Sequence, residues 1–130
     1  MNAQEQVSDV WRDLMRRHGR DPVSAERMLE ELVRAYAEPH RHYHTLSHIT
    51  ELFQLLKMHG GVADGDAVKL AVLFHDAVYD PARQDNEAAS ASLAVEQLTS
   101  LGFPAPLIDK VERYVLATQH GALPSANRGY

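Results

Sequence analysis

The amino-acid sequence predicts an all-α fold, a bundle of about six helices that forms one domain over residues 1–130. Two patterns indicate this fold. Apolar residues recur at spacings of three and four along most of the chain, which is typical of amphipathic helices. No segment alternates apolar and polar residues over a length that would indicate a β-strand. A chain of 130 residues suits one domain and buries roughly two thirds of the surface that its unfolded form exposes.

The first two helices are each indicated by an apolar stripe. The stripe of the first helix consists of Val7, Val10, Trp11, Leu14 and Met15. The stripe of the second helix consists of Met28, Leu29, Leu32, Val33 and Tyr36. Gly19 and Pro22 separate the two helices. Ser24 is the expected cap of the second helix, and Pro39 ends it.

The next two helices flank the middle of the chain. Thr45 is the expected cap of the third helix, which stops at Gly60 and Gly61. Its apolar residues are Leu46, Ile49, Leu52, Phe53 and Leu56. The fourth helix has the sequence AVKLAVLFHDAVYD and is capped by Asp64 or Asp66. Because this segment is apolar on nearly all sides, we expect it to be buried in the middle of the domain.

The last two helices are indicated mainly by their boundaries. Asp85 is the expected cap of an alanine-rich fifth helix that ends before Gly102. Pro104 and Pro106 open the sixth helix, LIDKVERYVLATQH, which stops at Gly121.

Composition excludes several classes of protein. The chain has no cysteine, which excludes disulfides and thiolate metal sites and fits a reducing compartment. A net charge of −5 argues against tight non-specific binding of nucleic acid. No apolar run approaches the roughly 20 residues of a membrane span, and the polar N-terminus lacks a signal-peptide core. We therefore expect a cytoplasmic protein with neither a membrane nor a nucleic-acid partner.

The first candidate for chemistry is the pair His75-Asp76 in the apolar fourth segment. A charged aspartate among apolar residues is costly unless a cation or hydrogen bonds compensate it. An imidazole and a carboxylate together suit manganese, iron, zinc, nickel or magnesium. The alternative is a buried hydrogen-bonded pair that holds no metal, and the pair taken alone favours that alternative.

The second candidate is the segment YHTLSHI, which contains His44 and His48. A spacing of four places both side chains on one face of a helix, and this spacing can bind one metal ion. The alternative is a helix start that carries surface histidines.

Further polar residues follow the His75-Asp76 pair. Asp80 and Glu87 are candidates to orient a water molecule or accept its proton near a metal ion. The alternative makes Asp80 and Asp85 turn and cap residues, and for Asp85 it is the preferred interpretation. His120 closes the sixth helix, where a cation is favoured by the helix dipole.

Taken together, four segments resemble the HD superfamily of metal-dependent phosphohydrolases. These segments are YHTLSHI, LFHDAVYDP, QDNEAASA and ATQH, in this order between Tyr43 and His120. The chain looks most like small bacterial proteins that are predicted HD phosphohydrolases. The resemblance implies an HD-domain-like helical bundle and a single divalent metal ion, which is Mn, Fe, Zn, Ni or Mg.

The resemblance also implies roles for individual residues. His75, Asp76 and one earlier histidine are the expected metal ligands; His48 is favoured over His44 because its apolar neighbours follow the rhythm of the family. His44 is then expected to contact the substrate or support the ligands, as part of a catalytic group with Asp80 and Glu87.

The same resemblance implies a phosphate-binding group and a substrate. Arg83 and His120 are expected to bind the phosphate. The implied activity is hydrolysis of a small phosphate ester or nucleotide. The alternative is a non-catalytic domain of the same fold, with an incomplete site, that binds a ligand or a protein partner.

Two departures from the family pattern bear on these expectations. Tyr79 stands where the HD hydrolases that cleave ppGpp have a glutamate, and no acidic residue follows Glu112 to supply the last aspartate ligand of the family. We therefore expect either a fragment truncated at its C-terminus or a natural protein that has lost a ligand. In both cases we expect weak metal binding, weak or absent phosphatase activity, and a homodimer formed through an uncovered apolar face of the sixth helix. That face consists of Val111, Val115 and Leu116.

Overall fold

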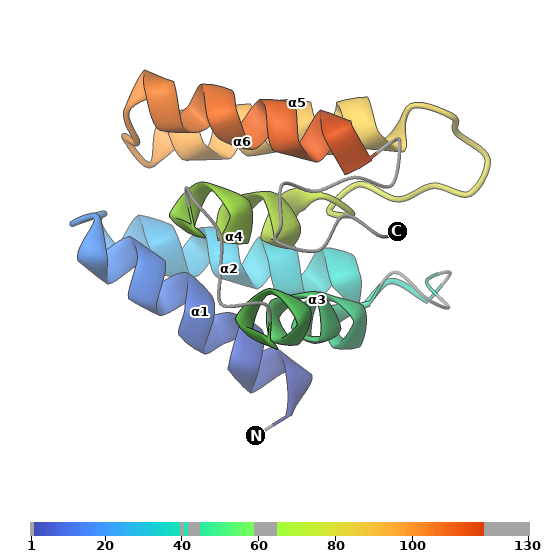
Figure 1. Ribbon diagram of the computed structural model, residues 1–130, viewed down its shortest axis with the longest axis horizontal. Coiled ribbons are helices and arrows are strands. Elements are labelled where there is room, and N and C mark those ends of the chain that lie inside the picture. Colours follow the sequence, from blue (N-terminus) through green and yellow to red (C-terminus); the bar gives the residue numbers. More distant parts are fainter. Residues whose placement is uncertain (1, 40, 42–44, 59–64, 119–130) are drawn as a thin grey trace.

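Six α-helices and no β-strand make up the regular structure of the residues described, which are 2–39, 41, 45–58 and 65–118 of the computed structural model (Figure 1). This result confirms the predicted all-α fold. The helices are α1 (Ala3–Arg17), α2 (Pro22–Tyr36), α3 (Leu46–Met58), α4 (Gly65–Phe74), α5 (Asn86–Ser100) and α6 (Ala105–Ala117). None of the helices in these residues has both the length and the hydropathy needed to cross a lipid bilayer.

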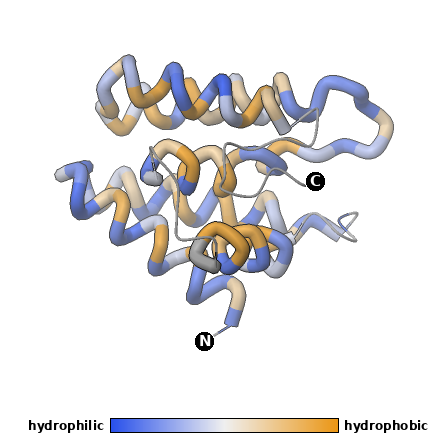
Figure 2. Tube along the Cα trace, in the orientation of Figure 1, coloured by the Kyte–Doolittle hydropathy of each residue, from blue (hydrophilic) through white to orange (hydrophobic). Residues whose placement is uncertain are grey.

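Helix α4 lies in the middle of the bundle. Figure 1 shows the paired helices α5 and α6 on one side of α4 and the helices α1, α2 and α3 on the other. Helix α4 packs against α3, α5 and α6, and Figure 2 shows hydrophobic residues along most of its length. Its buried residues are Ala67, Val68, Leu70, Ala71, Val72, Leu73 and Phe74. The prediction of a central buried helix is therefore confirmed.

The N-termini of α1 and α2 are held by side chains of the preceding residues. Asn2 accepts a hydrogen bond from the backbone N–H of Glu5, and the Glu5 carboxylate accepts one from the N–H of Asn2, which forms a capping box. Helix α2 begins at Pro22, and its cap is Asp21, which accepts from the N–H of Ser24. The prediction that Ser24 is the cap was wrong because Pro22 already occupies the first helical position, where its missing N–H costs nothing.

The predicted fourth helix also needed correction at its ends, whereas α5 begins after Asp85 and ends before Gly102, as predicted. Helix α4 ends at Phe74, so the pair His75-Asp76 lies in the turn that follows the helix and not on the helix itself. Asp66 lies inside the first turn of α4. Asp85 is the N-cap residue of α5, but its side chain makes no capping hydrogen bond; the guanidinium of Arg83 holds both of its carboxylate oxygens.

The face of α6 that was expected to be uncovered lies in the core. Val111 and Val115 are completely buried, because α6 packs against both α4 and α5, whereas Leu116 is 37% exposed. The prediction of an exposed apolar face was therefore wrong for two of its three residues. With those side chains buried, the physical reason for expecting a dimer through this face is removed.

Polar contacts along α1 join this helix to the rest of the bundle. The indole N–H of Trp11 donates to the carbonyl of Ala25 on α2 across 2.9 Å. At the C-terminal end of α1, Arg17 donates two hydrogen bonds of 2.9 Å to the Asp66 carboxylate, and His18 Nε2 lies 2.9 Å from the same group. The hydrogen bonds from Arg17 lower the pKa of Asp66 to about 2; partial burial opposes this effect and His18 adds to it.

Replacing Asp66 with asparagine should lower the free energy of unfolding by about 1–2 kcal/mol at neutral pH, after allowance for partial solvent screening. The pKa of Asp66 is lower in the folded protein than in the unfolded chain. Its stabilising effect is therefore complete above the unfolded pKa of about 3.9 and is lost as the pH falls through about 2. Urea unfolding from neutral to acid pH measures the difference between the two proteins, which should shrink in acid.

The matched control is Asp109→Asn, which removes a carboxylate that is 63% exposed and pairs with Arg113 at 3.3 Å. An exposed pair of this kind contributes little, so the control should unfold like the wild type. An Asp66→Asn deficit that stays constant with pH would contradict the electrostatic explanation.

Candidate metal centre

The pair His75-Asp76 is presented by the turn that follows α4. Nδ1 of His75 lies 2.7 Å from the carbonyl oxygen of Val72, one helical turn back. The carbonyl can only accept, so Nδ1 carries the proton and donates. Nε2 of His75 then faces the Asp76 carboxylate, whose Oδ2 is 3.2 Å away. The end of α4 therefore sets the direction in which the imidazole points.

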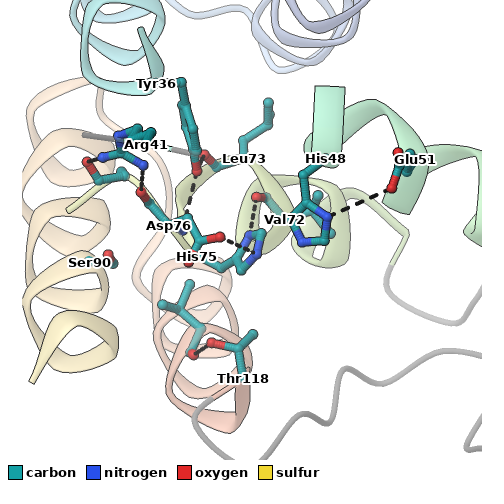
Figure 3. Close-up of polar contacts among 12 residues, drawn as sticks. Tyr36, Arg41, His48, Glu51, Val72, Leu73, His75, Asp76, Ser90 and Thr118 are labelled. Carbon is teal, nitrogen blue, oxygen red and sulfur yellow. Dashed lines mark hydrogen bonds and ion pairs between the residues drawn. The ribbon is translucent and has the colours of Figure 1, made fainter. Parts of the chain in front are cut away.

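His48 approaches the same pair from α3 (Figure 3). Its ring centroid lies 5.9 Å from that of His75, with an angle of 54° between the two planes. His48, His75 and Asp76 each offer one ligand atom, and these atoms lie within 4.8 Å of one another. Nδ1 of His48 is 4.0 Å from the carboxylate of Glu51 on the next turn of α3. Two segments separated by the whole of α4 thus contribute to one group of donors.

The donor set fits a divalent metal ion. Two imidazoles and one carboxylate suit zinc, iron, manganese or nickel. Bonds of about 2.0–2.2 Å to one ion hold ligand atoms at most about 4.4 Å apart, so small side-chain movements complete the arrangement. A metal-binding histidine usually donates its other ring N–H to a carbonyl or carboxylate, as His75 does to Val72. The side chains of His48, His75 and Asp76 are 20%, 9% and 15% exposed, so the group is largely shielded yet reachable from solvent.

The protonation of His75 follows from its neighbours. Burial disfavours the charged imidazole, but the hydrogen bond and the negative charge of Asp76 outweigh this effect. The Val72 carbonyl and the negative charge of Glu87 also favour the charged imidazole, so the pKa of His75 is raised. The charged form of His75, in contact with the Asp76 carboxylate, is therefore favoured when no metal ion is bound.

Three further residues hold the turn in place, and the sequence prediction did not include them in the site. The hydroxyl of Tyr36 donates to the carbonyl of Leu73 and accepts from the N–H of Asp76. Burial, together with the charge of Asp76, raises the pKa of Tyr36, so this hydroxyl keeps its proton. The guanidinium of Arg41 donates to the carbonyls of Asp76 and Ala77.

The third of these residues is Ser90 on α5. Its hydroxyl accepts from the N–H of Val78 at 3.0 Å and donates to the carbonyl of the same residue at 3.2 Å. Ser90 is completely buried and lies four and eight residues before the buried Ala94 and Leu98. A polar residue in a buried helical stripe is a signal that the sequence did contain. Arg41 follows no periodic pattern, so no comparable signal existed for it.

The structure places the predicted carboxylates differently. Asp80 is exposed, and its Oδ1 accepts from the N–H of Ala82 in a turn. Its backbone N–H donates to Asn86. Asp80 is therefore not part of the donor group among the described residues and acts here as a turn residue. Glu87 is half-buried in the first turn of α5, and its charge acts on His75.

The predicted phosphate-binding residues are only partly described. Arg83 is exposed and makes two hydrogen bonds, of 2.7 and 2.9 Å, to the carboxylate of Asp85. His44 and His120 lie outside the described residues. Their predicted roles stay predictions.

Fold and site together define an all-α protein with a candidate metal centre of two imidazoles and one carboxylate. Comparison of the chain with family models, curated proteins and solved structures found no match. Membership of the HD superfamily therefore remains a prediction from the sequence segments.

Replacing Ser90 with alanine should lower the free energy of unfolding by about 1–3 kcal/mol, because both backbone groups of Val78 lose a partner. Denaturant unfolding gives the value. Ser92→Ala is the matched control, since Ser92 is exposed on the same helix and the change in helix propensity is the same. Equal stability of the two variants would mean that the Ser90 hydroxyl does not hold the turn.

Proposed function

We propose that the protein binds one divalent metal ion through His48, His75 and Asp76 and uses it to hydrolyse a small phosphate ester, such as a nucleotide. The observation that carries the proposal is the convergence of these three donors from two separate segments. The hydrogen bond from His75 to the Val72 carbonyl supports it further, because it presents Nε2 to the shared site.

The three ligands leave part of the coordination shell of a metal ion open for a reacting group. Three protein ligands are typical of catalytic sites, whereas structural sites are usually closed by four. A divalent cation at this place would polarise a phosphate oxygen and lower the pKa of a water molecule. The chain itself supplies the ligands, a largely shielded environment and a carboxylate that can hold a proton.

Glu87 is better placed than Asp80 to accept a proton from the water molecule. Its half-buried carboxylate acts electrostatically on His75, whereas the carboxylate of Asp80 is exposed and engaged in a turn. We therefore assign Glu87 the role of orienting water and accepting its proton.

The choice of phosphate as the substrate group rests on the four sequence segments that resemble HD phosphohydrolases. Arg83 is exposed close to the start of α5, but Asp85 holds its guanidinium. A phosphate that binds Arg83 must therefore compete with this carboxylate. His44 and His120 stay candidates for the same role.

Titration of the metal-free protein with Mn²⁺ in a calorimeter should show one site per chain. His48→Gln and Asp76→Asn each remove a donor and should weaken binding by more than the roughly 10–100-fold that loss of a supporting group causes. Circular dichroism should show that both variants stay helical. Asp109→Asn, which removes an exposed carboxylate on α6, should bind as the wild type does. Unchanged affinity in Asp76→Asn would exclude the assigned site.

Release of phosphate from p-nitrophenyl phosphate and from nucleoside monophosphates should require Mn²⁺ and should be lost in Asp76→Asn. Glu87→Gln should lower kcat by about 10²-fold or more, the usual contribution of a positioned acid or base, while metal affinity changes little. One tightly bound metal ion without any phosphate release would favour the non-catalytic domain over the hydrolase.

A further inference from the structure

Arg41 is buried in an unusual position, just before α3 and beside the turn that carries Asp76. Its side chain is 0% exposed. Nη1 donates to the carbonyl of Asp76 across 2.7 Å and Nη2 donates to the carbonyl of Ala77 across 3.0 Å. Nε donates to the carboxylate of Glu38, also across 3.0 Å. Two different nitrogens of the guanidinium thus bind two successive backbone carbonyls.

Two aromatic rings flank the guanidinium. Its central carbon lies 4.9 Å from the ring centroid of Tyr36 and 5.7 Å from that of Tyr79, within the range of cation–π contacts. Burying a cation is costly even when it is well paired, and an apolar side chain of similar size often stabilises a fold more. Packing alone therefore does not account for an arginine at this position.

The contacts of Arg41 act on the backbone of a proposed metal ligand. Arg41 holds the carbonyl of Asp76, and Tyr36 accepts from its N–H. Both polar backbone groups of Asp76 are therefore fixed by side chains outside α4. In Figure 3, Arg41 lies on the side of Asp76 away from His75, whose Nε2 contacts the Asp76 carboxylate. Arg41 therefore holds the backbone of Asp76 from one side, while the Asp76 carboxylate points to the other side, toward His75.

We propose that Arg41 is a positioning residue for the metal centre: by holding the carbonyls of Asp76 and Ala77, it fixes the backbone from which the Asp76 carboxylate meets His75 and His48. The inference rests on the proposed metal site. Arg41 uses two nitrogens of a rigid, planar group, one for each carbonyl, and a flexible lysine with a single nitrogen does not reproduce that geometry.

The direction of the effect separates positioning from simple electrostatics. Removing a positive charge near a cation site should by itself strengthen cation binding. Loss of the hydrogen bonds from Arg41 to the backbone should weaken cation binding, because Asp76 is no longer held in place. A weaker affinity in a neutral Arg41 variant therefore has the opposite sign to the charge effect.

The chain contains a matched control for this experiment. Arg20 also donates to two successive backbone carbonyls, those of Leu101 and Gly102 at the end of α5. Its guanidinium lies 5.3 Å from the ring centroid of Phe103. Arg20 differs from Arg41 in that Nη1 alone makes both bonds and in being half-buried. Arg20→Gln still removes a guanidinium that holds a turn, without touching the proposed site.

Titration with Co²⁺, followed by its visible absorption, tests the proposal in the wild type and in Arg41→Gln, Arg41→Lys and Arg20→Gln. Circular dichroism and urea unfolding measure folding and stability of the same samples. We expect Arg41→Gln to bind Co²⁺ about 10–100-fold more weakly, as for other losses of ligand support, with an altered absorption band. Arg41→Lys should fall between this variant and the wild type, and Arg20→Gln should match the wild type in affinity and band.

Each contrary result overturns the inference. If Arg41→Gln folds and binds Co²⁺ with wild-type affinity, the hydrogen bonds of Arg41 do not position the metal ligands, although the proposed metal site remains supported. Equal weakening in Arg20→Gln shows that general loss of stability is the cause. If Arg41→Gln does not fold, Arg41→Lys decides by the same criterion. A wild-type chain that binds no Co²⁺ overturns both this inference and the proposed function.

Discussion

The central constraint on this structure is that α4, apolar on nearly all sides, ends inside the protein. The last carbonyls of a helix have no partner within the helix, and a buried carbonyl without a hydrogen bond is costly. At this end, side chains take the place of water. His75 donates to Val72 and Tyr36 to Leu73, and Arg41 donates to Asp76 in the turn that follows the helix. The polar cluster beside the core follows from this need as much as from any chemistry.

These partners come from different parts of the chain, and this is what assembles the site. The bonds that satisfy the end of α4 bring the C-terminal end of α2, the segment before α3 and the middle of α5 to one turn. His75 serves both purposes, since one ring nitrogen satisfies a carbonyl and the other faces Asp76 and the proposed metal. Stability of the turn and geometry of the donors are therefore coupled.

Periodicity was sufficient to predict six helices and the central position of α4, because apolar spacing reports directly on burial. The end of α4 was not predictable in this way. The run LFHDAVYD continues a helical pattern, and the side chains that bind the end of the helix and the turn after it, those of Tyr36 and Arg41, lie more than thirty residues earlier. The choice of His48 over His44 came from its apolar neighbours, and the structure places His48 beside His75. Asp80 and Glu87 looked equivalent in sequence, and only burial separated them.

The single tryptophan of the chain has a consequence for observing this protein in solution. Trp11 is completely buried, and its ring meets that of Phe74 edge-on, with centroids 6.0 Å apart. Phe74 directly precedes His75, so the indole lies one aromatic contact from the turn. Indole emission responds to the polarity and rigidity of its surroundings. The intrinsic fluorescence of the unlabelled protein therefore reports, from within the core, on the C-terminal end of α4.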